Sequence, residues 1–489
     1  MSPLLLPIVL PVVGTLFILA GSNPRKTALG TAALNLLGFV AICGMYDFRA
    51  GGHQFLFSAP VIPQLGVSFT LGADGLALAM LGLTTIVTLA AVLVARTPAK
   101  MPGAYFASLL LISAGAAGAF VSVDAFFFYM FHELALIPTF LLIGIWGSGD
   151  RQQAAWKITI YLAFGSFVLL LGLIGLYLSL PAGARTFDMR EIASLAEIGA
   201  FVPHDSVFLL LFFGFGILVS LFPFHTWAPQ AYASAPAPAA MLHAGVLKKF
   251  GLYGILRLVS PVFPEFLIDR WSPLLLVLIA GNIFYVGLVT IGQRKLDLML
   301  GNSSVMHMGY AFLGIVAWNQ LGLNGAAFTL IAHGLTIAAL FALCGELRER
   351  TTTLDFNDLG GLAGKMPSFG LLFGFAAMAS VGLPGFAGFA AELLVFFGTA
   401  AAGGADFAGL NLYQIVLVLA VWGVVISAVY MLRAYRKVFL GEMPERWAGL
   451  PEIGVPARVA VTVLLALLMV AGFWPSGLLS LLSPCLMLP

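Results

Sequence analysis

The sequence predicts an all-α membrane protein that forms a single membrane domain over residues 1–489 and crosses the bilayer fourteen times. Of its 489 residues, 61% are hydrophobic and only 9% are charged, a composition typical of multi-spanning membrane proteins and rare among soluble ones. The apolar residues also occur in runs long enough to cross a hydrocarbon core of about 30 Å as helices. Proline and glycine interrupt two of these runs, which indicates helices broken inside the membrane.

The fourteen predicted helices follow one another along the whole chain. The first, in MSPLLLPIVLPVVGTLFILAG, lacks the basic residues that precede the apolar core of a cleaved signal peptide, so we interpret it as a spanning helix. The spans begin near Ser2, Thr27, Leu76, Tyr105, Asp124, Trp156, Val207, Pro236, Pro273, Leu300, Gly325, Pro367, Leu412 and Ala457.

Basic residues are distributed unequally between the two sets of predicted loops. Sixteen lie in the loops of one side, whereas the other side has only Arg49, Arg185, Arg190, Arg257 and Arg270. Because cytoplasmic loops of membrane proteins are enriched in lysine and arginine, the first set is predicted to be cytoplasmic. With an even number of crossings, both termini are then expected on the outer side.

The seventh and twelfth spans contain residues that break a helix. The seventh includes Pro223 and Pro229, and the twelfth includes Gly382, Pro384, Gly385 and Gly388. Broken helices at membrane depth are tolerated where they line protein or a water-filled cavity. Ordinary proline kinks are the alternative for each break alone.

The two breaks lie five helices apart. This spacing is expected if helices four to eight and nine to thirteen form two inverted repeats, which we place at residues 105–260 and 272–440. Such repeats are typical of transporters whose ion sites lie near the middle of the membrane.

Glu133 is an acidic residue far from both ends of the predicted span Val121–Trp146. A carboxylate at that depth is costly unless it faces the interior of the helix bundle, a polar cavity or a partner. Glu133 is therefore a candidate proton carrier, and a helix–helix hydrogen bond from a permanently protonated glutamic acid is the alternative.

Five further ionisable residues inside predicted spans are the main candidates: Lys248, Lys249, His307, His333 and Glu392. His132 is a weaker candidate, because it lies about 100° round the helix from Glu133 and contact with a neighbouring helix is the alternative. Bases and acids that alternate along one depth can pass protons near neutral pH. Each histidine alone is more simply a packing residue, and Lys248 can also extend toward the cytoplasmic surface. Together, however, the five predict a polar seam through the membrane.

Other kinds of site have little support in the sequence. Cys43, Cys344 and Cys485 are far apart and form no CxxC or Cys/His pattern, so no metal site, iron–sulfur cluster or disulfide framework is indicated. The net charge of +2 is too small to suggest nucleic-acid binding. The expected partners are the lipid bilayer and other membrane proteins.

Several segments resemble the antiporter-like subunits of respiratory NADH-quinone oxidoreductase, and within them the subunit M type, the counterpart of mitochondrial subunit 4. The segments include FHELALIPTFLLIGIWG, LFPFHTWAPQ, MLHAGVLKKFGLYG, NSSVMHMGYAFLGI and SVGLPGFAGFAAE. The resemblance implies a fourteen-helix fold with two inverted repeats that each hold a half-channel. It also implies proton translocation driven by quinone reduction elsewhere in the complex, other antiporter-like subunits as partners, no bound cofactor, and a bacterial inner membrane location.

The resemblance also assigns residues one by one. Glu133 matches the fifth-helix glutamate of the family, Lys249 the eighth-helix lysine, and Glu392 the twelfth-helix acidic residue. His307 and His333 match the histidines of the tenth and eleventh helices. These residues, with Lys248, are the expected proton-carrying site.

The seventh helix departs from the family pattern. The family has a lysine five residues before the Pro-aromatic-His-Thr-Trp run, and here that position is Leu218. The glutamate–lysine pair expected at Glu133 is thus missing one member, while Lys248 and His243 are additions. Either the additions compensate, or the channel works differently or not at all.

Three alternative functions stay open at this point. They are a subunit of a multi-subunit Na⁺/H⁺ antiporter, a subunit of a membrane-bound hydrogenase, and a structural spacer that keeps the fold without conducting ions. Leu218 is the strongest argument for the spacer.

Overall fold

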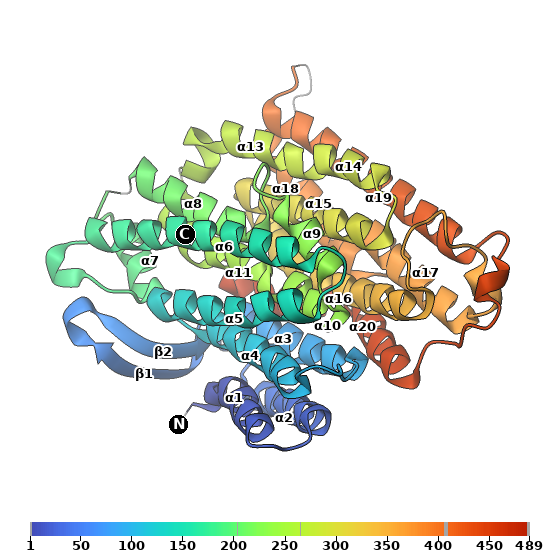
Figure 1. The fold of residues 1–489 in the computed structure, drawn as a ribbon. Helices are drawn as coiled ribbons and strands as arrows, with labels where there is room; N and C mark the ends of the chain where they lie inside the picture. Colours follow the sequence, from blue (N-terminus) through green and yellow to red (C-terminus); the bar gives the residue numbers. More distant parts are fainter. Residues whose placement is uncertain (1, 203, 265, 405–408, 487–489) are drawn as a thin grey trace.

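Helices make up most of the computed structural model, which describes residues 2–202, 204–264, 266–404 and 409–486. They lie side by side (Figure 1), and the long helices range from largely exposed at the edge of the bundle to fully buried at its centre. Within these residues, nine helices are long and apolar enough to cross a membrane. Shorter apolar helices accompany them, so the chain is a multi-pass helical membrane protein.

The chain begins with α1 (Leu6–Leu19) and α2 (Pro24–Met45), which pack against each other at one edge of the bundle (Figure 1). Asn23 accepts a hydrogen bond from the backbone N–H of Lys26 (3.1 Å) and so caps α2. Most of α2 is exposed, as expected for a helix that faces lipid.

The prediction of an all-α fold is wrong between α2 and α3. The strands β1 (Gln54–Ile62) and β2 (Val67–Ala73) form an antiparallel hairpin at one end of the bundle (Figure 1). Its turn ends at Gly66, whose φ of 66° suits glycine. The segment links two predicted spans and no strand is predicted in it, although its aromatic and β-branched residues around a Pro/Gly turn are a hairpin signal.

Aspartate caps mark the start of three of the long helices in the first half. Asp74 precedes α3 (Gly75–Val94), Asp124 precedes α5 (Ala125–Trp146) and Asp150 precedes α6 (Arg151–Ser179); each accepts hydrogen bonds from backbone N–H groups of the first turn. The caps satisfy donors that would otherwise be unpaired at the membrane boundary. The other helices here are α4 (Pro102–Val121) and the short amphipathic α7 (Met189–Glu197) beside the hairpin.

The first predicted break separates α8 (Asp205–Val219) from α9 (Trp227–Ser234). Asn282 pairs with the backbone on both sides of Leu221: its amide donates to the carbonyl of Ser220 (3.1 Å), and its Oδ1 accepts from the N–H of Phe222 (2.6 Å). The groups freed by the break are therefore satisfied by a neighbouring helix, as the membrane interior requires.

The helix that carries the two lysines is irregular. It consists of α10 (Ala237–Leu242), the π-helical turn η4 (His243–Leu247), α11 (Lys249–Gly254), a second π-helical turn η5 (Ile255–Val259) and α12 (Ser260–Val262). π-Helical turns are often found at functional sites. The sequence predicts a single regular span here, so the two turns are additional findings.

The second half surrounds α16 (Gln320–Thr351), a helix whose membrane-spanning part is buried throughout (Figure 1). The second predicted break separates α17 (Pro367–Val381) from α18 (Ala387–Gly403), both of which pack against α16. The remaining elements are the π-helical turn η6 (Phe266–Arg270), α13 (Ser272–Ala280), the π-helical turn η7 (Gly281–Tyr285), α14 (Val286–Gly292), α15 (Leu296–Val316), α19 (Leu412–Phe439), α20 (Val455–Phe473) and α21 (Pro475–Leu482).

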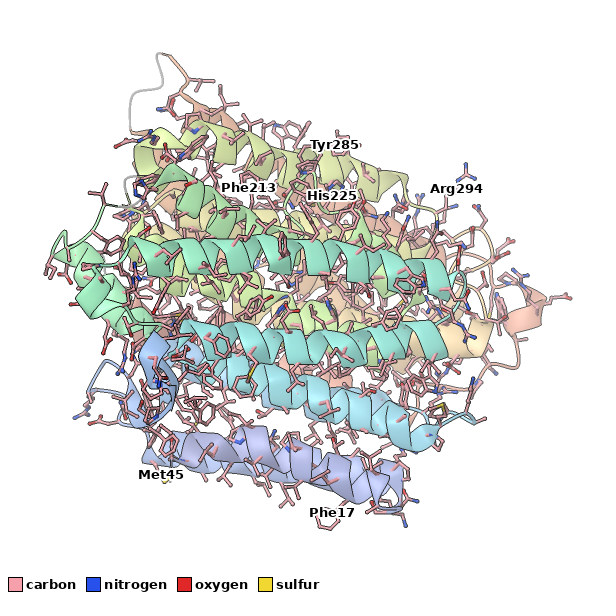
Figure 2. The ribbon with its side chains drawn as sticks, turned by 60° about the vertical axis from the view of Figure 1, so that its left-hand side comes forward. Phe17, Met45, Phe213, His225, Tyr285 and Arg294 are labelled. Carbon is pink, nitrogen blue, oxygen red and sulfur yellow. The ribbon has the colours of Figure 1, made fainter. Side chains whose placement is uncertain are left out.

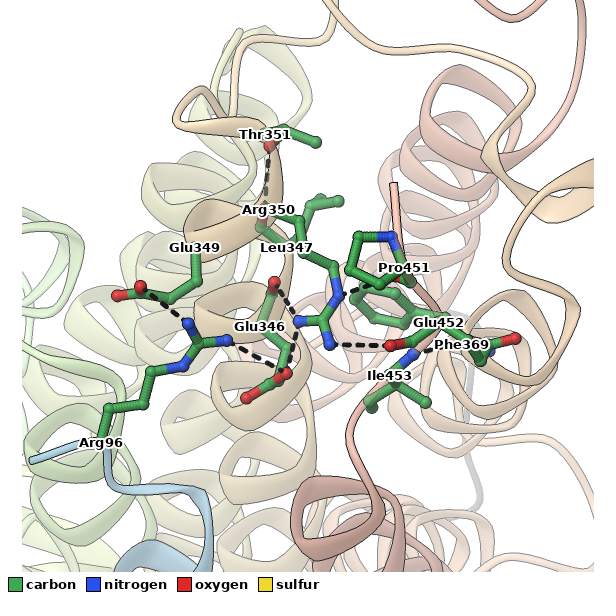
Figure 3. Close-up of polar contacts among 10 residues, drawn as sticks. All are labelled: Arg96, Glu346, Leu347, Glu349, Arg350, Thr351, Phe369, Pro451, Glu452 and Ile453. Carbon is green, nitrogen blue, oxygen red and sulfur yellow. Dashed lines mark hydrogen bonds and ion pairs between the residues drawn. The ribbon is translucent and has the colours of Figure 1, made fainter. Parts of the chain in front are cut away.

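An ionic network ties the end of α16 to the segment before α20 (Figure 3). Arg350 pairs with Glu346 (2.5 Å) and donates to the carbonyls of Pro451 (3.1 Å) and Glu452 (3.0 Å). The Glu452 carboxylate accepts the first free N–H groups of α17, where a negative charge is favourable. Arg96 adds a contact with Glu349 (3.3 Å).

The same end of the molecule carries other basic loop residues, among them Arg294 (Figure 2). Met45, at the far end of α2, lies at the opposite end of the bundle in that view. In the loops of the basic end, hydrogen bonds from Thr353 and Arg446 hold the pKa of the exposed Asp358 below its usual value.

Candidate functional site

Lys249 and His333 are brought into direct contact at the centre of the bundle. The Lys249 ammonium lies 2.7 Å from Nδ1 of His333 and donates to the carbonyl of Ala244 (2.6 Å). Lys249 is fully buried. It is the first residue of α11, and its side chain faces α16. Two basic groups at this distance share protons, because both cannot easily carry a positive charge at once.

His307 of α15 is next to His333, with ring centroids 5.8 Å apart. Its Nδ1 lies 2.8 Å from the carbonyl of Ser303 and its Nε2 lies 3.0 Å from the carbonyl of Ser380. Ser380 is near the end of α17, so His307 satisfies a carbonyl close to the second break. An imidazole with an acceptor at each nitrogen can hold a proton on either one.

Glu392 faces a small cavity that both imidazoles also line. The cavity has a volume of about 30 Å³, which is enough for at least one water. Its polar lining includes His307, Tyr310, His333, Thr336, Ser380 and Glu392. Glu392 is only 7% exposed, and no described side chain forms a hydrogen bond with its carboxyl group. The cavity therefore connects the histidines of α15 and α16 to the acid of α18.

Lys248 does not point to Glu133, contrary to one of the arrangements considered from the sequence. Its ammonium lies 3.3 Å from the hydroxyl of Ser304 on α15 and 5.8 Å from the ring centroid of Tyr232. Tyr232 in turn bonds to Nδ1 of His243 (3.2 Å). Both lysines thus contact the second half of the bundle, Lys248 through α15 and Lys249 through α16.

Glu133 lies apart from this row. Its Oε1 accepts a hydrogen bond from the Ser166 hydroxyl (2.5 Å), and Nδ1 of His132 is 3.4 Å from the same oxygen. In the described part of the chain, no lysine or arginine lies within ion-pair distance of it. The side chain is 35% exposed and borders a groove of about 580 Å³ between α5 and α6. The carboxyl group therefore faces the outer surface of this subunit rather than the seam.

Leu218 is buried at the end of α8, where the family pattern has a lysine. It lies against Gly165 of α6, next to Ser166. The structure thus brings the altered position close to the Glu133 site.

Two residues of the site were missed from the sequence. Ser166 and Asn282 are single polar residues within apolar helices, and neither type carries a charge that would mark it. Mid-helix serine usually bonds to its own helix, so only the fold reveals that Ser166 reaches Glu133. The described residues contain no group of three or more histidine, cysteine or acidic side chains placed to hold a metal ion.

Buried ionisable groups in a row, beside two helices that are interrupted inside the membrane, define a membrane protein of the antiporter-like class. The sequence matches the family described as NADH:quinone oxidoreductase/Mrp antiporter, TM, over residues 122–427. The chain belongs to this family.

Individual relatives agree with this assignment and confirm the resemblance predicted from the motifs. The protein named NAD(P)H-quinone oxidoreductase chain 4 1 of Picosynechococcus sp. is 36% identical over 482 residues, 97% of this chain and 87% of the relative. NADH-quinone oxidoreductase subunit M of Rickettsia prowazekii is 32% identical, covering 89% of this chain and 88% of that protein.

The fold is similar to that of a solved assembly. One chain of respiratory complex I from Thermus thermophilus with bound NADH superposes with a TM-score of 0.85 at 27% identity. The match covers 99% of this chain and 100% of that chain. The similarity therefore extends over the whole fold, beyond the matched family segment.

Proposed function

We propose that this chain is a proton-translocating membrane subunit of an NADH-quinone oxidoreductase. The observation that carries the proposal is a row of four buried ionisable residues: Lys249, His333, His307 and Glu392. Lys249 contacts His333, His333 lies beside His307, and a small cavity joins the two histidines to Glu392. Buried ionisable residues inside a membrane mark proton or ion routes by default. The quinone is reduced elsewhere in the assembly, and the energy of that reduction drives proton translocation through this subunit.

Each residue of the row has a distinct role in this proposal. Lys249 receives the proton and shares it with His333; His307 passes it on to Glu392 by way of the cavity and its water. Glu392 follows the break between α17 and α18, where freed backbone groups and water can accompany a proton outward. Glu133, on α5, modulates the charge on the two lysines. Lys248 tunes the charge on Lys249 from the adjacent position in sequence.

The proposal includes fourteen membrane crossings in two inverted repeats. Support comes from the nine long apolar helices and the shorter segments between them, which follow the predicted order. The break between α8 and α9 and the break between α17 and α18 occupy equivalent places within residues 105–260 and 272–440. Each repeat supplies one half-channel, and the broken helices mark where the half-channels meet the row.

The proposal also places the protein in its membrane. The loops rich in lysine and arginine are cytoplasmic, both termini are on the outer side, and the membrane is the inner membrane of a bacterium. The partners are the other membrane subunits of the complex, including antiporter-like ones. The exposed face that carries Glu133 is available for such a neighbour.

Purification of the complex from a strain with an affinity tag on this chain tests the assignment. We expect NADH-quinone oxidoreductase activity to co-purify with the tagged chain. We also expect the interior of vesicles containing the purified complex to acidify when NADH and quinone are added. Retention of a sodium-transporting assembly without NADH oxidation would contradict the proposal in favour of an antiporter subunit.

A second candidate function is a non-conducting spacer, and Leu218 favours it. A leucine at this position cannot carry the charge that the family pattern has beside the fifth-helix glutamate. The spacer predicts that substitutions along the row leave the number of protons moved per NADH unchanged.

A further inference from the structure

The environment of Glu133 contains an arrangement that the sequence did not predict. The Leu218 side chain fills the space against Gly165, so no positive charge reaches Glu133 from α8. Lys248 and Lys249 are engaged with Ser304 and His333. Glu133 must therefore find its polar partners elsewhere.

Two side chains converge on a single oxygen of Glu133. The Ser166 hydroxyl donates to Oε1 over 2.5 Å, and Nδ1 of His132 lies 3.4 Å from the same atom. His132 is buried, and its Nδ1 has no hydrogen-bond partner. A buried ring nitrogen without a partner is uncommon, and Oε1 of Glu133 is near enough to become its partner once the ring and the carboxyl group are aligned.

The ring of His132 is held in place from the opposite direction. It stacks on the ring of Phe250 with centroids 3.9 Å apart and planes inclined by 20°. Phe250 directly follows Lys249 in α11. The imidazole therefore lies between the carboxyl group of α5 and the helix that carries the lysines.

We propose that His132 replaces the missing lysine as the titratable partner of Glu133, and that Ser166 positions the carboxyl group for it. This inference rests on the proposed function, since it names the partner of a residue in the same proton-carrying site. A proton moves from the Glu133 carboxyl group to Nδ1 of His132, which leaves a carboxylate and an imidazolium; the reverse transfer restores both neutral groups. The positive charge then lies against the ring of Phe250, the residue that follows Lys249 in α11.

Such a pair differs from a glutamate–lysine pair in a useful way. An imidazole exchanges its proton near neutral pH, whereas a lysine keeps its charge unless burial removes it. In the proposed pair, His132 is positively charged only while it holds the proton taken from Glu133. Ser166 keeps one oxygen in place in both states, because a hydroxyl can donate to a carboxylate or accept from a carboxylic acid.

The variant His132→Phe tests the proposal, because phenylalanine retains the ring stack on Phe250 and removes both nitrogens. In vesicles with the purified complex, we expect the number of protons moved per NADH to fall by roughly tenfold or more, in keeping with loss of a proton-transfer group. Adding Leu218→Lys to this variant is expected to restore much of the loss, since a lysine there lies beside Ser166. A purely structural role for His132 would not be rescued by a charge on another helix.

Thr139→Val is the matched control. Thr139 is a buried polar residue of the same helix whose hydroxyl, among the described residues, bonds only to the carbonyl of Ala135 (3.0 Å). We expect this variant to pump like the parent. An equal loss in the control would overturn the proposal, because any polar change in α5 would then suffice.

Glu133→Gln separates this inference from the proposed function. Normal pumping by His132→Phe with impaired pumping by Glu133→Gln would overturn the role of His132 and leave the proposed function standing. Normal pumping by both would overturn both proposals. Should His132→Phe fail to assemble, His132→Gln carries the same test, since it keeps a polar group that cannot titrate.

Discussion

Lys248 and Lys249 are adjacent in sequence and equally buried, but their contacts differ. Lys249 touches an imidazole of the proposed row, whereas Lys248 touches only a serine hydroxyl and an aromatic ring. A lysine that shares protons with a histidine can take part directly in transfer. A lysine with neutral neighbours acts at most through its charge.

We therefore expect Lys249→Met to abolish most proton movement and Lys248→Met to reduce it only in part. Methionine keeps the apolar stem and removes the ammonium group. The measurement is the number of protons moved per NADH in vesicles with equal amounts of complex. A greater loss in Lys248→Met than in Lys249→Met would reverse the assigned roles.

Glu392 presents a carboxyl group to the cavity without a hydrogen-bond partner among the described side chains. Glu392→Gln keeps the shape but cannot release a proton. We expect a large loss of pumping with a normal amount of assembled complex in the membrane. If pumping and assembly fell together, a packing role for Glu392 would explain the result better.

Charge made Glu133 and part of the row predictable from the sequence. Glu133, Lys249 and Glu392 are recognisable because ionisable side chains in long apolar runs demand an explanation. Their contacts were not predictable, because a sequence does not tell which helices are neighbours. The direction of Lys248 and the roles of Ser166 and His132 depend on such neighbours and on the π-helical turn η4.

At the scale of elements, the breaks in the seventh and twelfth predicted spans were expected from proline and glycine. The structure adds how their free backbone groups are hydrogen-bonded. Asn282 pairs with backbone groups at the first break, and His307 pairs with a backbone carbonyl beside the second. Helix starts were predicted to within a few residues, because apolar runs and caps mark them. The hairpin β1–β2 was missed, because a short connecting segment gives little periodicity to read.

Asn282→Ala should destabilise the protein, because it leaves backbone groups at the break between α8 and α9 without hydrogen-bond partners. Buried backbone groups left unpaired cost about 1–3 kcal/mol each, and Asn282 serves the carbonyl of Ser220 and the N–H of Phe222. We expect less assembled complex and a lower melting temperature of the purified complex. Asn35→Ala is the control, since Asn35 is similarly buried but makes one hydrogen bond, at 3.4 Å; equal effects of the two variants would argue against the role of Asn282.

At the scale of the whole molecule, orientation in the membrane is the first property to test. α2 has the exposed Arg25 near its start and the exposed Arg49 beyond its end. In a variant without the three native cysteines, we expect Arg49→Cys to react with a membrane-impermeant maleimide added outside intact spheroplasts. Arg25→Cys should react only after the membrane is opened, and the opposite pattern would invert the proposed topology.

The central claim is that buried ionisable groups of this chain carry or control protons during NADH oxidation. Glu133 is the residue at which this claim is most easily contradicted, because its side chain is 35% exposed at a surface groove and the lysine that the family pattern pairs with it is replaced by Leu218. The direct test is the ratio of protons moved to NADH oxidised in vesicles that contain the complex with Glu133→Gln. We predict that NADH oxidation continues and assembly is normal, while the ratio falls clearly below that of the parent complex. An unchanged ratio in fully assembled complex would contradict the account and favour a subunit that supports the assembly without conducting protons.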